Sequence, residues 1–239
     1  MTGGGSGIGA AVVERFAELG AVGTVVDLPR TDSGSLPEGW QFQPADVREE
    51  ADVAAAVAAA ARAHGGLDAV VAAAGVVPTW QPPAEMDISD FARVLEINVL
   101  GVAATVKHVA SLLTDGATVT VVASLNSWKG DPNITSYAAS KHAALGIVRS
   151  AALALGPSGV RVNAVAPGPI ATGALLGRMA ARSGATGLSP DEALAAAARG
   201  TALGRIATVH DVVSAVVFLT GSMSAGMTGQ MLNVDCGVL

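Results

Sequence analysis

The sequence predicts one α/β domain in which a parallel sheet is covered by helices on both faces. Short valine-rich runs alternate with longer stretches rich in alanine and leucine along the whole chain, as in a doubly wound sheet. The 239 residues, 51% of them hydrophobic, are enough to bury one sizeable core. We therefore expect residues 1–239 to form a single domain.

The strands and helices can be placed in chain order from these runs. Strands are expected near residues 22–27, 40–43, 68–74, 117–123, 160–166 and 230–234. Helices are expected near residues 8–19, 49–64, 89–113, 136–155 and 208–219. The alanine-rich stretches at 54–61 and 193–198 are interpreted as helices, because alanine is the strongest helix former. Thr208 and Asp211 are expected to form a capping box, with aspartate in place of the usual glutamate.

Composition and charge exclude several classes of partner. A net charge of −6 and a pI near 5.1 argue against nucleic acid and against anionic lipid surfaces. No apolar stretch reaches the ~18 uninterrupted residues of a membrane span, and no signal-peptide pattern is present. The single cysteine, Cys236, cannot form an internal disulfide, which fits a cytoplasmic protein. No metal site is expected.

Tyr137, the only tyrosine, stands four residues before Lys141 and thirteen after Ser124. In a helix over residues 136–155, Tyr137 and Lys141 would share one face and point into one pocket. A phenol is a poor base at neutral pH, but a nearby ammonium stabilises the phenolate and lowers the pKa of the phenol. This spacing predicts proton transfer coupled to hydride chemistry on alcohols and carbonyls.

A glycine-rich run at residues 2–9 leads directly into a helix-like segment. Glycines let backbone N–H groups approach a pyrophosphate, and a helix N-terminus favours its negative charge. Asp27 follows Gly7 by twenty residues and ends an apolar run, where its carboxylate can accept hydrogen bonds from the adenosine ribose hydroxyls. Because this carboxylate would repel a 2′-phosphate, we predict NAD over NADP as cofactor. The predicted contacts from the run itself are Gly3, Ser6, Gly7, Ile8 and Gly9.

Together these motifs resemble the short-chain dehydrogenase/reductase family. The resemblance runs from residue 2 to the C-terminus and rests on T-G-x-x-x-G-x-G at residues 2–9, Asp27, Asp46-Val47, Asn98, Ser124, Tyr137, Lys141 and Pro167-Gly168. It implies a Rossmann-like fold, a homotetramer, and a nicotinamide dinucleotide lying across the C-terminal ends of the strands. The expected reaction is hydride transfer between NAD(H) and a secondary alcohol or ketone, with the tyrosine as general acid and base.

The resemblance also implies roles for individual residues. Ser124 would bind the substrate oxygen, and Lys141 would hydrogen-bond the nicotinamide ribose. Asn98 would hold a water that relays protons from Lys141 to solvent. Further cofactor contacts are expected from Asp46, Val47 and Gly75, and from Pro167, Gly168, Ile170 and Thr172 in the loop that contacts the nicotinamide carboxamide.

A substrate lid is expected at about residues 171–204. Leu175, Leu176 and Met179 could line an apolar pocket with Trp80 and Trp128, or could simply pack a helix against the body. Arg178 and Arg182 could meet an anionic substrate group, or could be solvated.

Two departures from the family pattern stand out. The family's glycine loop normally follows an apolar strand, but here only Met1 precedes Thr2, so the sheet is expected to lack its first strand. We hypothesise that the natural protein starts several residues earlier, and that a valine start codon has been read as Met1. The second departure is Ala72-Ala73-Ala74-Gly75 in place of N-N-A-G, which is expected to remove one structural hydrogen bond.

Two other functions remain open at this point. A 3-oxoacyl-thioester reductase is the rival enzyme, and Asp27 weighs mildly against it because biosynthetic reductions commonly use NADP. A truncated, non-catalytic dinucleotide-binding protein is the rival of another class. Intact Ser124, Tyr137, Lys141 and Asn98 favour the enzyme.

Overall fold

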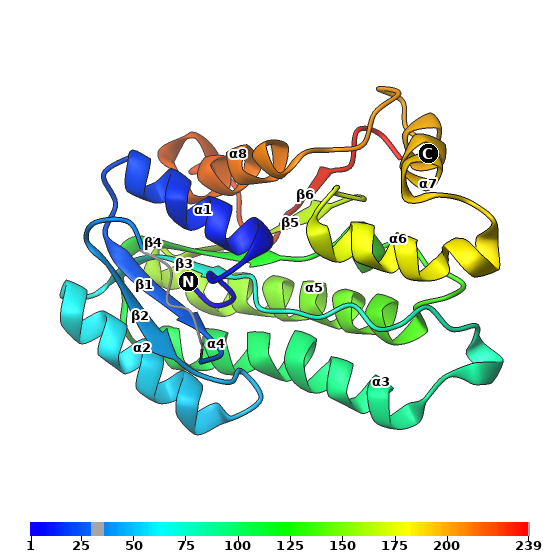
Figure 1. Cartoon of the computed structure of the whole chain (residues 1–239). Helices are drawn as coiled ribbons and strands as arrows, with labels where there is room; N and C mark the ends of the chain where they lie inside the picture. Colours follow the sequence, from blue (N-terminus) through cyan, green and yellow to red (C-terminus); the bar gives the residue numbers. More distant parts are fainter. Residues whose placement is uncertain (30–35, 239) are drawn as a thin grey trace.

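The computed structural model describes residues 1–29 and 36–238 and contains six parallel strands flanked by helices (Figure 1). One ladder pairs β1 (Gly23–Asp27) with β2 (Trp40–Pro44). The second runs in the order β3 (Leu67–Ala72), β4 (Leu113–Val122), β5 (Arg161–Pro167) and β6 (Met231–Val234). The predicted α/β fold class with a Rossmann-like parallel sheet is confirmed.

Helices cover both faces of the sheet (Figure 1). One layer holds α1 (Gly7–Glu18) and α8 (Val209–Thr220), and the other holds α2 (Glu50–His64), α4 (Gly101–Val109) and α5 (Thr135–Leu155). The remaining helices are α3 (Ile88–Leu95), α6 (Gly173–Thr186) and α7 (Pro190–Arg199). The capping box of α8 forms as predicted, because Thr208 Oγ1 accepts from the Asp211 N–H and Asp211 Oδ2 accepts from the Thr208 N–H.

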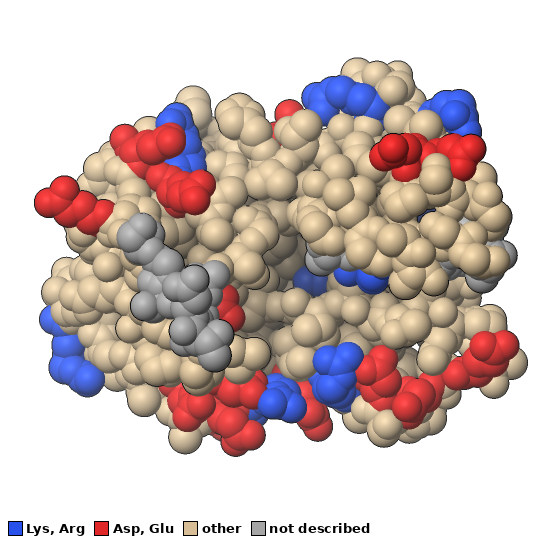
Figure 2. All heavy atoms as spheres, in the orientation of Figure 1, with Lys and Arg blue, Asp and Glu red and all other residues tan. Residues whose placement is uncertain are grey.

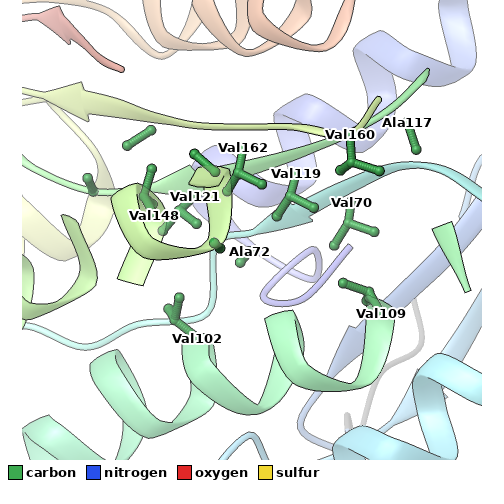
Figure 3. Close-up of a cluster of buried hydrophobic side chains, with 14 of the residues drawn as sticks. Val70, Ala72, Val102, Val109, Ala117, Val119, Val121, Val148, Val160 and Val162 are labelled. Atoms are coloured by element: carbon green, nitrogen blue, oxygen red, sulfur yellow. The ribbon is translucent and has the colours of Figure 1, made fainter. Parts of the chain in front are cut away.

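Successive residues of the central strands bury themselves on opposite faces of the sheet. Val70 packs toward α2, α4 and α5, whereas Val71 packs toward α1 and α8. Figure 3 shows the first of these clusters, in which Val119, Val121 and Val162 from the strands meet helix residues such as Val102 and Val148. Burial on both faces explains why these strands are almost continuous runs of valine and alanine.

Two elements differ most from the sequence prediction. The helix predicted over 89–113 is divided by a π-helical turn at Glu96–Leu100 and ends at Val109. The strand predicted from 117 begins at Leu113, because the Thr114 hydroxyl donates to Asp68 at 2.6 Å and ties this segment to β3. Gly116, with φ +74°, then lets the chain bulge before regular pairing starts at Thr118.

Residues 1–3 stand where the sheet would hold another strand, between β1 and β3. The Thr2 N–H donates to Val71 O at 3.0 Å, and the Ala73 N–H donates to Thr2 O at 3.0 Å. On the other side, the Gly3 N–H donates to Val26 O at 2.8 Å and the Val26 N–H to Met1 O at 2.7 Å. These three residues therefore join the two ladders at the carboxyl ends of their strands, and no full strand lies between β1 and β3 within the described residues.

A cavity of 380 Å³ continues this position toward the amino ends of β1 and β3. Its lining is largely apolar, with Phe16, Val22, Trp40, Val57 and Val70 among its residues. Among the described residues, β1 and β3 form no direct ladder with each other across it. The cavity therefore lies where another strand would pair with β1 and β3, and its apolar lining would suit the side chains of a buried strand. Met1 closes one end of it and donates from its amino group to Thr24 O at 2.7 Å.

A short apolar strand, for example Val-Ala-Leu-Val-Val, fused directly before Met1 should stabilise the protein. It would pair with both edges and fill the cavity, so we expect the midpoint of thermal unfolding to rise by at least about 5 °C. An extension of equal length made of glycine and serine is the control. Equal midpoints for the two extensions would show that the cavity does not accept a strand.

Stability should also depend on the charge of the Met1 amino group. Burial lowers its pKa from 8.0 to about 5. The unfolded chain therefore holds a proton that the folded chain has released between pH 5 and 8, so the free energy of unfolding should rise over this interval. The gain should be at most about 4 kcal/mol, and smaller to the extent that water still reaches the group.

Urea unfolding at pH 5, 6, 7 and 8 measures this dependence. The apolar-extended chain, in which Met1 no longer carries a free amino group, is the reference. Parallel pH curves for the two proteins would contradict the assignment to the Met1 amino group.

Candidate active site

The glycine run forms one wall of a 740 Å³ cleft at the carboxyl ends of the strands. Figure 2 shows the molecule hollowed at its centre on this face. Gly3 has φ +66°, and a Cβ there would overlap the backbone of Ala74; a Cβ on Gly9 would overlap the Gly3 carbonyl oxygen. Helix α1 begins at Gly7, and its N-cap, Ser6, makes no side-chain cap. The first N–H groups of α1 thus face the cleft and can receive an anion, so a pyrophosphate fits this cradle.

All the residues predicted from the glycine run line this cleft. With them lie Asp27, Asp46, Val47, Gly75 and Thr172, as the sequence also predicted. Residues that the sequence did not indicate include Leu28, Arg48, Val76, Arg93 and Val122. These residues line the cleft because of their position in the fold, and no sequence motif identifies them.

Asp27 ends β1 and faces the glycine loop. Its Oδ2 accepts from the Gly5 N–H and its Oδ1 from the Leu28 N–H, both at 2.8 Å. Arg48, the nearby cation, is held by Asp46 through Nη2 to Oδ2 at 2.6 Å and Nε to Oδ2 at 3.0 Å. The hydrogen bond from Arg48 lowers the pKa of Asp46. The carboxylate of Asp27 and a guanidinium whose charge is already paired therefore both line the cleft.

A second cavity of 390 Å³ shares the walls of the cleft at Ile8, Gly75 and Thr172. Ser124, immediately after β4, and Tyr137 and Lys141, both on α5, line it together. The Lys141 ammonium lies 5.6 Å from the centre of the Tyr137 ring and donates to Val122 O at 2.9 Å. The structure thus brings together the three residues whose spacing the sequence singled out.

The electrostatics of Tyr137 differ from the sequence prediction. Burial raises the pKa of Tyr137, and a hydrogen bond with Ser124 and the charge of Arg178 oppose this rise. Burial also lowers the pKa of Lys141 to about 8, so the lysine loses its proton before the phenol would ionise. For this reason the expected lowering of the tyrosine pKa by Lys141 is not found in this state of the protein.

Asn98 lies behind Gly75, within the π-helical turn Glu96–Leu100, and is fully buried. Its Oδ1 accepts from the Val76 N–H at 2.8 Å, and its Nδ2 donates to Val76 O at 2.9 Å and to Ser140 Oγ at 3.0 Å. It lines neither cavity, and its observed role is to fix the strand-to-loop segment beside Lys141. A π-helical turn at a functional position is a recurring feature of enzymes.

The loop after β5 and the start of α6 close the second cavity. Pro167, Gly168 and Ile170 line it, and Thr172 lines both cavities while its hydroxyl accepts from the Leu175 N–H at 3.3 Å. Trp80 and Leu175 also line it, in agreement with the interpretation that these residues form an apolar pocket. The lining does not include Leu176 or Met179, the latter packed away from solvent, or the half-exposed Trp128. Arg178 lines it, whereas the side chain of Arg182 lies outside the described part of the chain.

Comparison with known proteins identifies the family to which this chain belongs. A family model described as "Enoyl-(Acyl carrier protein) reductase" matches residues 3–239. The chain belongs to the short-chain dehydrogenase/reductase family. This membership confirms the family predicted from the motifs and makes the protein an oxidoreductase by class.

Two relatives and one solved structure illustrate this short-chain dehydrogenase/reductase similarity. The chain is 35% identical to a cis-4-hydroxycyclohexanecarboxylate dehydrogenase of Sinomonas cyclohexanicum, covering 99% of this chain and 94% of that protein. It is 34% identical to a mitochondrial (−)-isopiperitenol/(−)-carveol dehydrogenase of Mentha piperita, covering 100% and 91%. The structure of NAD⁺-bound xylitol dehydrogenase matches with a TM-score of 0.91 at 30% identity, covering 99% and 96%.

Proposed function

We propose that this protein transfers a hydride between NAD(H) and a secondary alcohol or ketone. The observation that carries the proposal is one continuous hollow in which a dinucleotide-sized cleft opens into a cavity holding Ser124, Tyr137 and Lys141. The relatives named as dehydrogenases of cyclic alcohols and the NAD⁺-bound structural neighbour support this reading.

The residues of this chain divide the work between binding and proton transfer. A nicotinamide dinucleotide, when bound, accepts or supplies the hydride. The cradle of Gly3, Gly7 and Gly9 with the N-terminus of α1 would hold its pyrophosphate, and Asp27 its adenosine ribose. Lys141 would hydrogen-bond the nicotinamide ribose, and the loop from Pro167 to Thr172 would contact the carboxamide.

In the oxidation direction, Tyr137 first gives up its own proton and then, as phenolate, removes the proton of the substrate hydroxyl as the hydride leaves carbon. In the reduction direction, the same phenol returns that proton to the carbonyl oxygen. Ser124 stabilises the charge that develops on this oxygen by hydrogen bonding to it. Asn98 holds Val76 and Ser140 in place, and a water bound near it would connect Lys141 to solvent.

NAD is proposed over NADP because of the charges at the ribose end of the cleft. Asp27 presents a carboxylate there, and the Arg48 guanidinium that could bind a 2′-phosphate is bonded to Asp46. Arg93 also lines the cleft but is paired with Asp90 at 2.6 Å. Within the described residues, the cleft thus contains a carboxylate that would repel a 2′-phosphate and no unpaired arginine that would bind one.

Reduction of a 3-oxoacyl thioester is the second candidate, because the matching family model, described as "Enoyl-(Acyl carrier protein) reductase", also concerns reduction of thioester-linked acyl chains. Asp27 weighs against it where such reductions use NADP. A non-catalytic dinucleotide-binding role is disfavoured, because Ser124, Tyr137 and Lys141 meet in one cavity. A panel of cyclic alcohols, ketones and 3-oxoacyl thioesters would separate these candidates.

We also propose a homotetramer in the cytoplasm. The outer side of α5 carries small residues, Ala139, Ala143 and Gly146, and then Leu153 at 81% exposure, which suits close packing against another helix. The location rests on the single cysteine, Cys236. In the described part of the chain, no helix is both long and apolar enough to cross a bilayer. Light scattering at micromolar concentration tests the assembly.

Replacing the general acid and base should abolish turnover. Tyr137→Phe removes the hydroxyl and keeps the ring, so kcat should fall by at least about 10³-fold, within the usual range for such groups. Binding of NADH, followed by its fluorescence, and the thermal midpoint should stay close to those of the parent protein. A variant that kept a tenth of the parent kcat would show that another group moves the proton.

Replacing Asp27 should weaken NADH binding and relax cofactor choice. Loss of hydrogen bonds to a charged group predicts about a 10–100-fold higher Kd for NADH with Asp27→Ala. Asp27→Asn keeps an acceptor without the charge, so it should raise the affinity for NADPH while losing less for NADH. Both constants follow from fluorescence titration. If the parent protein and both variants discriminated equally between NADH and NADPH, residues other than Asp27 would determine the cofactor preference.

A further inference from the structure

Arg178 is a cation in the substrate cavity that the proton-transfer machinery does not require. It lies on α6 with Leu175 and Met179, three residues before and one after it, and both of those side chains are 9% exposed. This spacing puts Arg178 on the inward side of the helix. Accordingly it lines the cavity of Ser124 and Tyr137, and it is absent from the lining of the dinucleotide cleft.

The guanidinium of Arg178 has no partner among the described residues. It forms no hydrogen bond and no ion pair with them, and its Nε is shielded from solvent as well. A buried donor without an acceptor is unfavourable, and arginine cannot avoid this cost by losing its proton. An acceptor supplied by a ligand would satisfy it.

The charge around the cavity favours an anion. Lys141 and Arg178 line it, and Asp131 is the one carboxylate among its described lining residues. Asp131 is engaged by the Asn133 N–H at 2.8 Å and forms no ion pair with Arg178, and Lys141 is engaged by Val122 O. Figure 2 shows basic atoms in the hollow below α6. The rest of the lining is largely apolar, with Trp80, Ile134 and Leu175.

Arg178 is also near enough to the reacting group for one small molecule to reach both. Its charge acts on Tyr137, lowering the pKa of the phenol against the effect of burial. Both side chains line the same 390 Å³ cavity, a volume that suits a small molecule. A ligand with its alcohol or ketone at Tyr137 can thus carry an anionic group at Arg178.

We propose that Arg178 binds a carboxylate of the substrate, so that the protein acts on hydroxy acids and oxo acids with an apolar spacer between the two groups. This proposal rests on the proposed oxidoreductase function. The planar guanidinium matches a carboxylate through two parallel hydrogen bonds. The apolar walls suit a short hydrocarbon spacer better than a polyhydroxylated one.

The test compares oxo acids with their neutral carboxamides. The substrates are 4-oxopentanoate, 5-oxohexanoate and 6-oxoheptanoate with the matching amides, reduced by NADH. For at least one length, the parent protein should favour the acid by at least 10-fold in kcat/KM. Arg178→Gln should lower kcat/KM for that acid by at least 30-fold and for its amide by less than 3-fold. Arg199→Gln, an exposed arginine on α7, is the matched control and should change neither.

Two results would overturn the proposal. Equal losses for acid and amide, with a shifted pH profile of kcat, would mean that Arg178 acts through Tyr137. A stronger Arg178-dependent preference for dihydroxyacetone phosphate would assign the site to phosphate instead of carboxylate.

A binding measurement separates this proposal from the proposed function. Calorimetric titration with hexanoate in the presence of NADH should show binding to the parent protein and at least 10-fold weaker binding to Arg178→Gln. Such binding without turnover of any ketone would contradict the proposed function and leave the carboxylate site standing. Turnover of neutral ketones without hexanoate binding would contradict the carboxylate site and leave the proposed oxidoreductase function standing.

Discussion

The pairing of residues 1–3 with β1 and β3 is the constraint on which the rest of this structure depends. Thr2 bonds to Val71 and Ala73 on one side, while Met1 and Gly3 bond to Val26 on the other, so a single bridge joins a two-stranded ladder to a four-stranded one. The glycine loop starts from this bridge. Its Gly5 N–H then meets Asp27, and α1 follows with its N-terminus directed at the cleft. Positions of the cofactor-binding groups are thus set by four backbone hydrogen bonds.

The place of the bridge explains how a chain with an open sheet can still have a complete site. The bridge lies at the carboxyl ends of β1 and β3, where the cleft and the substrate cavity are. The 380 Å³ cavity between β1 and β3 lies toward the amino ends. Ser124 and Lys141 are supported from β4 and α5, which belong to the larger ladder and its core. The cavity between β1 and β3 therefore bears on stability and on the dinucleotide cradle more than on proton transfer.

Much of the fold was predictable because it follows from local patterns. Runs of valine buried on both faces mark the strands, and the box at Thr208 and Asp211 marks the start of α8. The π-helical turn around Asn98 was not predictable, because it depends on hydrogen bonds to Val76 and Ser140, 22 and 42 residues away. The sequence spacing was enough to identify Tyr137 and Lys141. Their pKa values depend on burial, which cannot be read from sequence spacing. The unpartnered state of Arg178 likewise required the packing of α6.

Amide hydrogen exchange, read residue by residue by NMR, tests the central claim most directly. If the bridge holds the two ladders together, the N–H groups of Thr2, Gly3, Val26 and Ala73 should exchange far more slowly than in an unstructured peptide, and more slowly again with NADH bound. Exchange of these four amides at the unstructured rate, while Val119 and Val121 in β4 stay protected, would contradict it. The smaller ladder and the cofactor cradle would then be detached from the core in solution.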